Sequence, residues 1–564
     1  MQLIKTIKNI DHVRALLALA LLFTGLNAFK PLAIDDTLYY YRARQVAEHP
    51  LDPYGFDIFW NDRPEPAIQV LAPPLFPYFW AVAIRLFGER PVLWKLCLFP
   101  LALLLVFSLH GLFRRFTPGH ELWLTWMAIM SPVFLPSFNL MLEVPVAALS
   151  LLALNIFLRA CDRNSFALAA LAGVVNGVAM ETKYSAFVIA AVMLVYALLF
   201  MKVRLGLLAA GLAGLVFAVV EGLTALRYGQ SNFLYVSAVY GSVHLLSKYA
   251  YLALPLVTLM GALAPALTLL GWTALKVRRG FIIAAATVIL CGYLALAFVP
   301  EQFQSFRMLN RQLTLAQLNF TVFGVASFGT LIAVIWQLCG LSFNWKDYLQ
   351  GWRDYRVELF LACWLLLEVG GYFALSPIPA ARRMPGPLIA SLLLVGRLAS
   401  RTCVSLECRR LLRGVAAGSM VLGLLFYVVD WRDAAAEKVA VELAAQKISD
   451  LRSTIPGPKN VWYMGRWGFQ YYAEHAGMKP VIADESQFQE GDLLVVPEVD
   501  YFPQIWTAHV NRYQREPLAL VSVADSLPLR TMMGYYNSGI PLNHHEGPRR
   551  MVRLYRIVSG SRRE

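Results

Sequence analysis

Two adjacent carboxylates, Asp35 and Asp36, follow the first apolar stretch of the chain and precede the aromatic run Tyr39–Tyr41. One interpretation is structural, because an acidic residue at the start of a helix caps free amides and interacts favourably with the helix dipole. The other is catalytic, because a carboxylate held where membrane meets water can act as a general base toward an attacking hydroxyl. We expect Asp35 to be this base and Asp36 to belong to the same catalytic group.

A further acid, Glu143, opens a later apolar segment, two residues before Pro145. Proline is common in the first turn of a helix, so Glu143 also has a structural interpretation as a partner of the helix dipole. Ionisable residues at membrane depth are costly, however, and are usually functional. We therefore predict that Glu143 faces the same side of the membrane as Asp35 and joins the catalytic residues.

Three cations are expected on that same side. Lys183 lies between two apolar segments, and Arg382 and Arg383 lie in a Pro-rich loop. Guanidinium groups bind phosphate oxygens bidentately, so we predict that these residues bind the phosphate of a substrate. Contact with lipid headgroups is the alternative for the two arginines.

Three aromatic residues, Tyr39, Tyr40 and Trp60, are predicted to bind substrate by stacking on sugar rings. Aromatic residues also anchor chains at membrane surfaces, which is the competing interpretation. The three acids would in addition suit Mg²⁺ or Mn²⁺, because these ions prefer oxygen ligands. No cofactor is otherwise required, and a divalent metal stays an open alternative.

The composition identifies the elements that must position these residues. Hydrophobic residues make up 58% of the 564 residues and charged residues only 15%. The apolar runs approach the roughly 20 residues that cross a bilayer, which predicts an all-α polytopic membrane protein with about 13 transmembrane helices. The predicted spans are 13–29, 92–113, 121–138, 143–159, 165–181, 185–201, 203–223, 249–274, 281–299, 317–339, 357–375, 385–398 and 411–429.

Basic residues cluster in alternate loops, as the positive-inside rule expects. With an odd number of spans, this pattern places the N-terminus inside and the polar insert 30–90 and the C-terminal part outside. We therefore divide the chain into a transmembrane module, 1–430, whose outer loop contains amphipathic helices, and an exported soluble α/β domain, 431–564. That domain is nearly neutral, with 16 Lys and Arg against 15 Asp and Glu.

Charge and cysteine content exclude some functions. Residues 1–430 hold 34 Lys and Arg against 21 Asp and Glu, so nearly all of the net charge of +14 lies in the membrane part rather than on a soluble face. We therefore expect no binding of nucleic acid. None of the seven cysteines falls in a predicted exported segment. We therefore expect no disulfides, and we expect Cys403 and Cys408 to lie in a cytoplasmic loop.

Several short motifs occur in a characteristic order. They are Asp35-Asp36 with Tyr39–Tyr41, Pro73–Trp80 leading to Leu86–Gly88, Glu143, Gly173 and Gly177 before Thr182–Tyr184, and Arg382 or Arg383 before a Pro-rich span start. As an ordered set over about residues 10–400, they resemble the GT-C fold glycosyltransferases that use polyprenyl-phosphate sugars. Within that group the chain is most similar to relatives of the protein O-mannosyltransferases and of the lipid A aminoarabinose transferase.

The resemblance implies an inverting transfer of a hexosyl or pentosyl unit from a polyprenyl-phosphate donor to an acceptor hydroxyl, with Asp35 as the general base. It implies a site on the outer, periplasmic face of a bacterial inner membrane, and a lipid, a glycan or a protein as acceptor. Two departures stand out. The second acid is Asp36 rather than Glu, and Ala72 replaces a Lys that contacts the carrier phosphate in the lipid A enzymes. The expected phosphate contacts therefore shift to the three cations named above.

A transporter or flippase of lipid-linked sugars is the competing function. It requires charges along a path through the membrane, and Glu221 and Glu368 are the acids inside apolar runs. Most of the other candidate charges lie near one predicted face, which favours the enzyme. Transfer measured without any translocation step separates the two functions.

Overall fold

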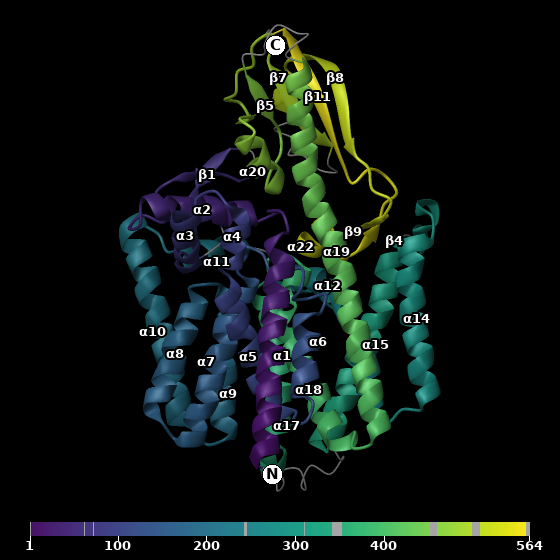
Figure 1. Cartoon of the computed structure of the whole chain (residues 1–564). Coiled ribbons are helices and arrows are strands. Elements are labelled where there is room, and N and C mark those ends of the chain that lie inside the picture. Colours follow the sequence, from purple (N-terminus) through teal and green to yellow (C-terminus); the bar gives the residue numbers. More distant parts are fainter. Residues whose placement is uncertain are drawn as a thin grey trace.

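The computed structural model describes residues 2–60, 63–70, 73–241, 245–308, 311–340, 352–451, 460–498 and 508–559. Most helices run side by side in one bundle, and a small sheet lies beyond one end of it (Figure 1). Helix α1 (Gln2–Ala28) begins at the far end of the bundle and ends beside α2 (Asp36–Glu48) at the sheet end. The start of the chain and Asp35 therefore lie at opposite ends of the bundle.

The prediction of a polytopic helical membrane protein is confirmed. Within the described residues, eight helices are long and apolar enough to cross a membrane, or nine if the pair α12–α13, bent by 75°, forms one broken span. The chain is thus an integral membrane protein. The further helices in the bundle are α6 (Glu121–Ile129), α8 (Phe166–Met180), α9 (Phe187–Leu199) and α18 (Pro385–Thr402). Helices α3 (Leu75–Phe87) and α11 (Asn232–Gly241) lie at its sheet end, near α2 (Figure 1).

The eight helices that are long and apolar enough to cross a membrane are α1, α4 (Pro91–Leu96) with α5 (Phe99–Phe116), α7 (Glu143–Arg163), α10 (Val203–Tyr228), α14 (Arg279–Phe298), α15 (Leu315–Cys339), α17 (Arg356–Leu375) and α19 (Leu406–Leu451). The bent pair is α12 (Leu245–Leu263) with α13 (Ala266–Ala274).

One predicted span is wrong. The segment 121–138 is helical only over α6, which has nine residues, and then continues as buried turns up to Glu143. Pro132 and Pro136 lie in these turns, and proline lacks the amide that an α-helix interior requires. Neighbouring elements bind parts of this irregular segment. The Tyr535 hydroxyl lies 2.9 Å from the Pro132 carbonyl oxygen, and the Leu140 amide donates to Asp36 at 2.9 Å.

Small residues allow close helix packing near the site. A Cβ atom on Gly173 of α8 would lie 2.4 Å from the carbonyl oxygen of Ala209 in α10, and one on Gly177 would lie 2.6 Å from Val216 Cβ. Any side chain at these positions would force the two helices apart. Close packing here fixes the C-terminal end of α8, from which Lys183 follows.

The C-terminal region, residues 460–559, contains a five-stranded sheet in the order β6-β5-β7-β11-β8. Strand β5 pairs in parallel with β6 and β7, and β11 pairs antiparallel with β7 and β8. Their bounds are β5 (Val461–Tyr463), β6 (Lys479–Pro480), β7 (Leu493–Glu498), β8 (Gln514–Val523) and β11 (Arg550–Ser559), with helix α20 (Gly468–His475) beside them. A second short helix of this region, α22 (Met532–Asn537), lies at the end of the bundle instead (Figure 1). The predicted small α/β unit is therefore confirmed.

Three two-stranded sheets complete the fold. They are β1 (Asp57–Phe59) with β2 (Pro64–Pro66), β3 (Ser305–Met308) with β4 (Arg311–Thr314), and β9 (Leu529–Arg530) with β10 (Asn543–His544).

Helix α19 joins the bundle to the sheet. Its 46 residues make it about 70 Å long at 1.5 Å per residue, more than twice the thickness of a hydrocarbon core. Its last turns pack Ala440, Val441 and Ala444 against the sheet (Figure 1). The position 430/431 proposed as a domain boundary lies inside this continuous helix.

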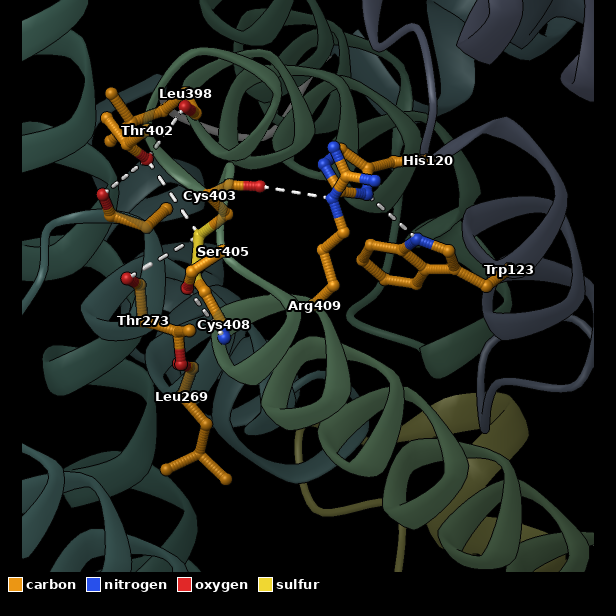
Figure 2. The surroundings of a disulfide bond; sticks show 11 residues. His120, Trp123, Leu269, Thr273, Leu398, Thr402, Cys403, Ser405, Cys408 and Arg409 are labelled. Carbon is orange, nitrogen blue, oxygen red and sulfur yellow. Dashed lines mark hydrogen bonds between the residues drawn. A yellow bond between two sulfur atoms is a disulfide. The ribbon is translucent and has the colours of Figure 1, made fainter.

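The expectation of no disulfide is wrong. Cys403, which directly follows α18, is disulfide-bonded to Cys408 in the first turn of α19, with their Cα atoms 5.4 Å apart (Figure 2). The turn brings them together because the Cys408 amide donates to Ser405 Oγ at 3.2 Å. The sequence separation of five residues does not by itself reveal this geometry.

Candidate active site

Asp35 lies in the turn between α1 and α2, and it forms an ion pair with Arg382. The preceding residue, Ile34, has a φ of 49°, which is rare for a β-branched residue and turns the chain sharply toward α2. Arg382 comes from η5 (Ala381–Arg383), the short turn between α17 and α18. Segments more than 340 residues apart in sequence therefore place an acid and a cation together.

Glu143 joins the same cluster from the first turn of α7. Its Oε1 atom accepts a hydrogen bond from Lys183 Nζ at 2.6 Å and lies 3.9 Å from Arg382 Nε. The side chain of Glu143 is 4% exposed and that of Lys183 is 17% exposed, so the pair is shielded from water without being sealed off. Asp35, Glu143, Lys183 and Arg382 thus form one continuous chain of ion pairs.

Burial and neighbouring charges set the ionisation of these cations. Burial lowers the pKa of Lys183 to about 8, and Glu143 partly opposes this effect. Burial would also lower the pKa of Arg382, but Asp35 and Glu143 beside it raise the pKa further than burial lowers it. Burial and the adjacent Arg382 lower the pKa of Arg383. The cluster therefore holds positive charge in a region of low dielectric constant.

A cavity of about 110 Å³ lies beside this cluster. Glu143, Lys183, Arg382 and Arg383 lie together in its wall, and Glu368 is a further acid of the lining. Its other walls come from apolar positions of α7, α9, α17 and α18, including Val146, Leu151, Ile189, Leu375 and Ile389. The cavity therefore offers one end to an anion and the rest to an apolar chain.

Several polar atoms at this cavity lack hydrogen-bond partners within the described part of the chain. They are Nε of Arg382, Nε of Arg383 and the hydroxyl of Tyr372. Arg382 Nε still lies in an ion pair, 3.9 Å from Glu143 Oε1. Leaving a buried donor unpaired costs about 1–3 kcal/mol, so the groups of Arg383 and Tyr372 are suited to donate to a ligand with acceptor oxygens. Glu368, also in the cavity wall, is instead paired, since Trp364 Nε1 donates to it at 2.8 Å.

Asp36 occupies a different environment from Asp35. Its side chain is fully buried and accepts hydrogen bonds from the amides of Leu140 at 2.9 Å and Ala33 at 3.1 Å. Burial raises the pKa of Asp36, and Lys95, whose Nζ lies 3.9 Å away, opposes the rise. Asp36 thus links the turn that carries Asp35 to the segment that leads into α7. Neither acid lines the cavity itself, and Asp35 reaches it through its ion pair with Arg382.

The three aromatic candidates are spread out. Tyr39 is buried, and its pKa is raised by burial and by Asp35 and Glu143, so it lies beside the acids. The Tyr40 hydroxyl donates to Glu89 at 2.9 Å, which directs this ring away from the ion pairs. Trp60 is half-buried and faces Trp467 of the C-terminal region, with ring centroids 6.5 Å apart.

The acids have little freedom to hold a metal ion. Asp35 is paired with Arg382 and Glu143 with Lys183, while Asp36 points to backbone amides. Among the described residues, no three His, Cys, Asp or Glu side chains are grouped as metal ligands. Lys183 and the arginines instead place positive charge in the wall of the cavity.

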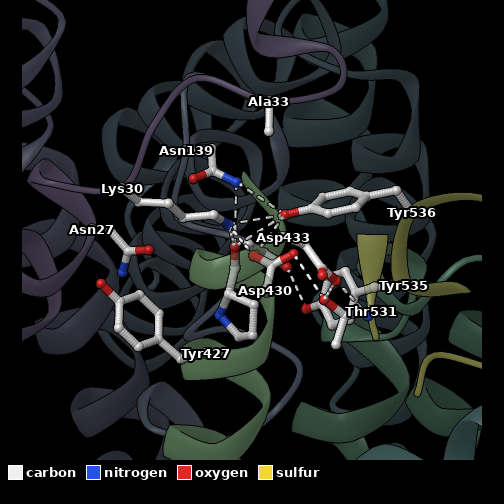
Figure 3. Close-up of polar contacts among 12 residues, drawn as sticks. Asn27, Lys30, Ala33, Asn139, Tyr427, Asp430, Asp433, Thr531, Tyr535 and Tyr536 are labelled. Carbon is white, nitrogen blue, oxygen red and sulfur yellow. Dashed lines mark hydrogen bonds and ion pairs between the residues drawn. The ribbon is translucent and has the colours of Figure 1, made fainter. Parts of the chain in front are cut away.

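A buried polar network that lies near the site was not identified from the sequence. Lys30, at the end of α1, is fully buried and pairs with Asp430 of α19 (Figure 3). The Tyr536 hydroxyl joins them, accepting from Lys30 Nζ at 3.1 Å and donating to Asp430 Oδ2 at 3.2 Å. In the sequence, this network is indicated only by the charges of Lys30 and Asp430, each at the end of an apolar run. Ala72, the position of the missing lysine, lies outside the described residues.

Comparison with known proteins supports a glycosyltransferase. Residues 72–221 match the family model "Dolichyl-phosphate-mannose-protein mannosyltransferase", a segment that contains Glu143 and Lys183. This match confirms the resemblance to the protein mannosyltransferase group that the motifs indicate. A search of the curated proteins found no match.

Three similar solved structures are also glycosyltransferases. The oligosaccharyltransferase AglB from Archaeoglobus fulgidus is 15% identical with a TM-score of 0.47, and the match covers 84% of this chain and 64% of that one. ArnT from Cupriavidus metallidurans, bound to undecaprenyl phosphate, is 15% identical with a TM-score of 0.42 over 99% and 100%. The arabinosyltransferase EmbB from Mycobacterium smegmatis is 12% identical with a TM-score of 0.34 over 91% and 48%. This chain thus spans less than two thirds of the length of the archaeal protein.

Proposed function

We propose that this protein transfers a sugar from a polyprenyl-phosphate donor to an acceptor hydroxyl, with inversion at the anomeric carbon. The observation that carries the proposal is the chain of ion pairs, Asp35–Arg382–Glu143–Lys183, at a cavity whose remaining walls are membrane helices. A ligand with an anionic head and a long apolar tail matches both parts. The family match over residues 72–221 names such a donor, a dolichyl-phosphate sugar.

In this proposal the donor phosphate binds at the charged end of the cavity. Arg383 and Tyr372 offer buried donors that no hydrogen-bond partner among the described residues occupies, and Lys183 lies beside them. Bonds from charged donors to phosphate oxygens are about twice as strong as neutral ones. The polyprenyl chain then follows the apolar walls between α7, α9 and α17. The partners are therefore this donor, a lipid, glycan or protein acceptor, and the surrounding lipids.

The proposed chemistry is a single displacement. The acceptor hydroxyl attacks the anomeric carbon from the face opposite the phosphate, and its proton passes to the Asp35 carboxylate. The bond between the anomeric carbon and the phosphate oxygen breaks, and the polyprenyl phosphate leaves as a monoester. Because Asp35 is paired with Arg382 in the free enzyme, we infer that Arg382 turns toward the bound phosphate and so frees Asp35 to accept the proton.

We propose that residues 1–430 form the transferase module and residues 431–564 an exported domain, with the site on the periplasmic face of a bacterial inner membrane. The cluster lies at the end of the bundle nearest the sheet, opposite the start of α1 (Figure 1). The basic N-terminus and the alternating basic loops favour placing the other end of the bundle in the cytoplasm.

The proposal is tested with purified protein in lipid nanodiscs, which have no compartment to transport into. Radiolabelled polyprenyl-phosphate sugar is supplied with a cell-envelope extract as the acceptor source, and transfer of label is followed. General-base catalysis contributes about 10²–10⁴-fold, so Asp35→Asn should lower kcat by that factor while donor binding persists. Full activity of Asp35→Asn would remove the base assignment. Absence of transfer by the wild type, with transport in sealed vesicles, would favour the transporter.

A further inference from the structure

The short helix α22 (Met532–Asn537) belongs to the C-terminal region by sequence, yet it lies within the site end of the bundle (Figure 1). It packs against η5, the turn that carries Arg382 and Arg383. It also contacts α19 through the buried network of Lys30 and Asp430 (Figure 3). A segment remote in sequence is therefore in direct contact with the turn that holds the arginines.

Tyr535 connects α22 to a second part of the site. Its side chain is fully buried, and its hydroxyl lies 2.9 and 3.0 Å from the carbonyl oxygens of Pro132 and Val133. The same hydroxyl lies 2.8 Å from Ser137 Oγ. All three partners belong to the irregular segment 130–142 between α6 and α7. The tyrosine thus replaces contacts that a regular helix would have provided there.

The segment 130–142 in turn carries the acids. Its Leu140 amide holds the Asp36 carboxylate at 2.9 Å, and its Met141 Sδ lies 3.8 Å from Arg382 Nη1. The segment ends at Glu143, the first residue of α7. A contact that fixes the position of this segment therefore also fixes the position of Glu143. Through the bond to Asp36, it fixes the turn that carries Asp35 as well.

We propose that Tyr535 is a positioning residue for the donor site. It touches no substrate; it fixes the segment that leads into Glu143 against the helix that supports Arg382 and Arg383. The relative placement of acids and arginines thereby depends on the C-terminal region. This inference rests on the proposed transferase function, and it adds that the phosphate site is complete only with α22 docked.

Tyr535→Phe tests the proposal, because it keeps the ring and removes the hydroxyl. The matched control is Tyr293→Phe in α14, whose buried hydroxyl also donates to a carbonyl oxygen, that of Ala262. The full chain is placed in nanodiscs, and binding of polyprenyl phosphate, donor KM, acceptor KM and Tm are measured. We expect Tyr535→Phe to weaken polyprenyl phosphate binding and raise donor KM about tenfold, as loss of one well-placed bond does. Acceptor KM should stay unchanged, and Tm should fall no more than in the control.

An unchanged Kd and donor KM in folded Tyr535→Phe would overturn the proposal, since a purely structural tyrosine lowers Tm alone. If Tyr535→Phe does not fold, Ser137→Ala decides, because it removes only one partner of the hydroxyl. A several-fold weaker binding of polyprenyl phosphate by Ser137→Ala is expected, and unaltered binding would refute the positioning role. A wild type that neither binds polyprenyl phosphate nor transfers sugar would instead refute the proposed function itself.

Discussion

Replacing Glu143 by Gln should lower the pH at which the donor stops binding. Lys183 Nζ lies 2.6 Å from Glu143 Oε1, next to the proposed phosphate position. Burial lowers the pKa of Lys183 to about 8; Glu143 opposes this effect, and Arg382 and Arg383 add to it. Above this pH the wild-type lysine loses its proton and its attraction for phosphate. We therefore expect the donor KM of the wild type to rise at alkaline pH.

The size of the effect follows from the short distance within the pair. Two unit charges 2.6 Å apart attract by about 1.6 kcal/mol even at the dielectric constant of water, and by more in a buried site. One pKa unit corresponds to about 1.36 kcal/mol, so losing the glutamate charge favours the neutral lysine by at least one unit. In Glu143→Gln the rise in donor KM should thus begin at least about one pH unit lower than in the wild type.

The measurement is donor KM between about pH 6 and about pH 10, at fixed acceptor concentration. The donor phosphodiester keeps a single negative charge over this range, so the profile reports the protein. Lys183→Arg is the matched control, because a guanidinium stays charged throughout and should remove the alkaline rise. Coincident profiles for Glu143→Gln and the wild type, or a persistent alkaline rise in Lys183→Arg, would refute the reasoning.

Two further substitutions separate binding from stability. Arg383→Gln should raise donor KM about 10–100-fold, because a charged donor to phosphate is lost, while acceptor KM stays constant; equal changes in both constants would count against a phosphate contact. Asp36→Asn should lower the free energy of unfolding by about 3–5 kcal/mol, because it leaves Lys95 buried without its ion-pair partner, 3.9 Å away in the wild type. Thermal unfolding in detergent measures this loss, and an unchanged Tm would show that the pair contributes nothing.

The sequence allowed the charged residues of the site to be chosen but not their separate placement. Each of Asp35, Glu143, Lys183 and Arg382 stands at the edge of an apolar run, where an ionisable group is costly without a purpose. The structure brings all four into one chain of ion pairs. Asp36 carries the same signal as its neighbour, yet it points to backbone amides, because successive residues at a helix start project in different directions.

Other features depend on contacts between distant segments, which local patterns do not encode. The segment 121–138 is apolar enough to resemble a span, but its prolines and its bonds to Tyr535 keep the second half irregular. Helix α19 continues past the change in composition near residue 430, because its last turns find a new apolar partner in the sheet. The hydropathy of a segment indicates whether it lies in lipid or in water. Whether the segment is helical, and where its helix ends, depends here on the elements that pack against it.

The charges of the ion-pair chain, taken together with Arg383, suit both the start and the end of the proposed reaction. With Asp35 and Glu143 ionised and Lys183, Arg382 and Arg383 protonated, these five groups carry a net charge of about +1. A phosphodiester donor brings one negative charge, so the loaded site is neutral. When the acceptor proton reaches Asp35, the net charge of the five protein groups increases by one. The phosphate becomes a dianion in the same step, so the sum stays neutral. Because uncompensated charge is costly in a low dielectric, this balance favours Asp35 as the proton acceptor. It also makes Arg383 necessary, although no acid of the described ranges forms an ion pair with it.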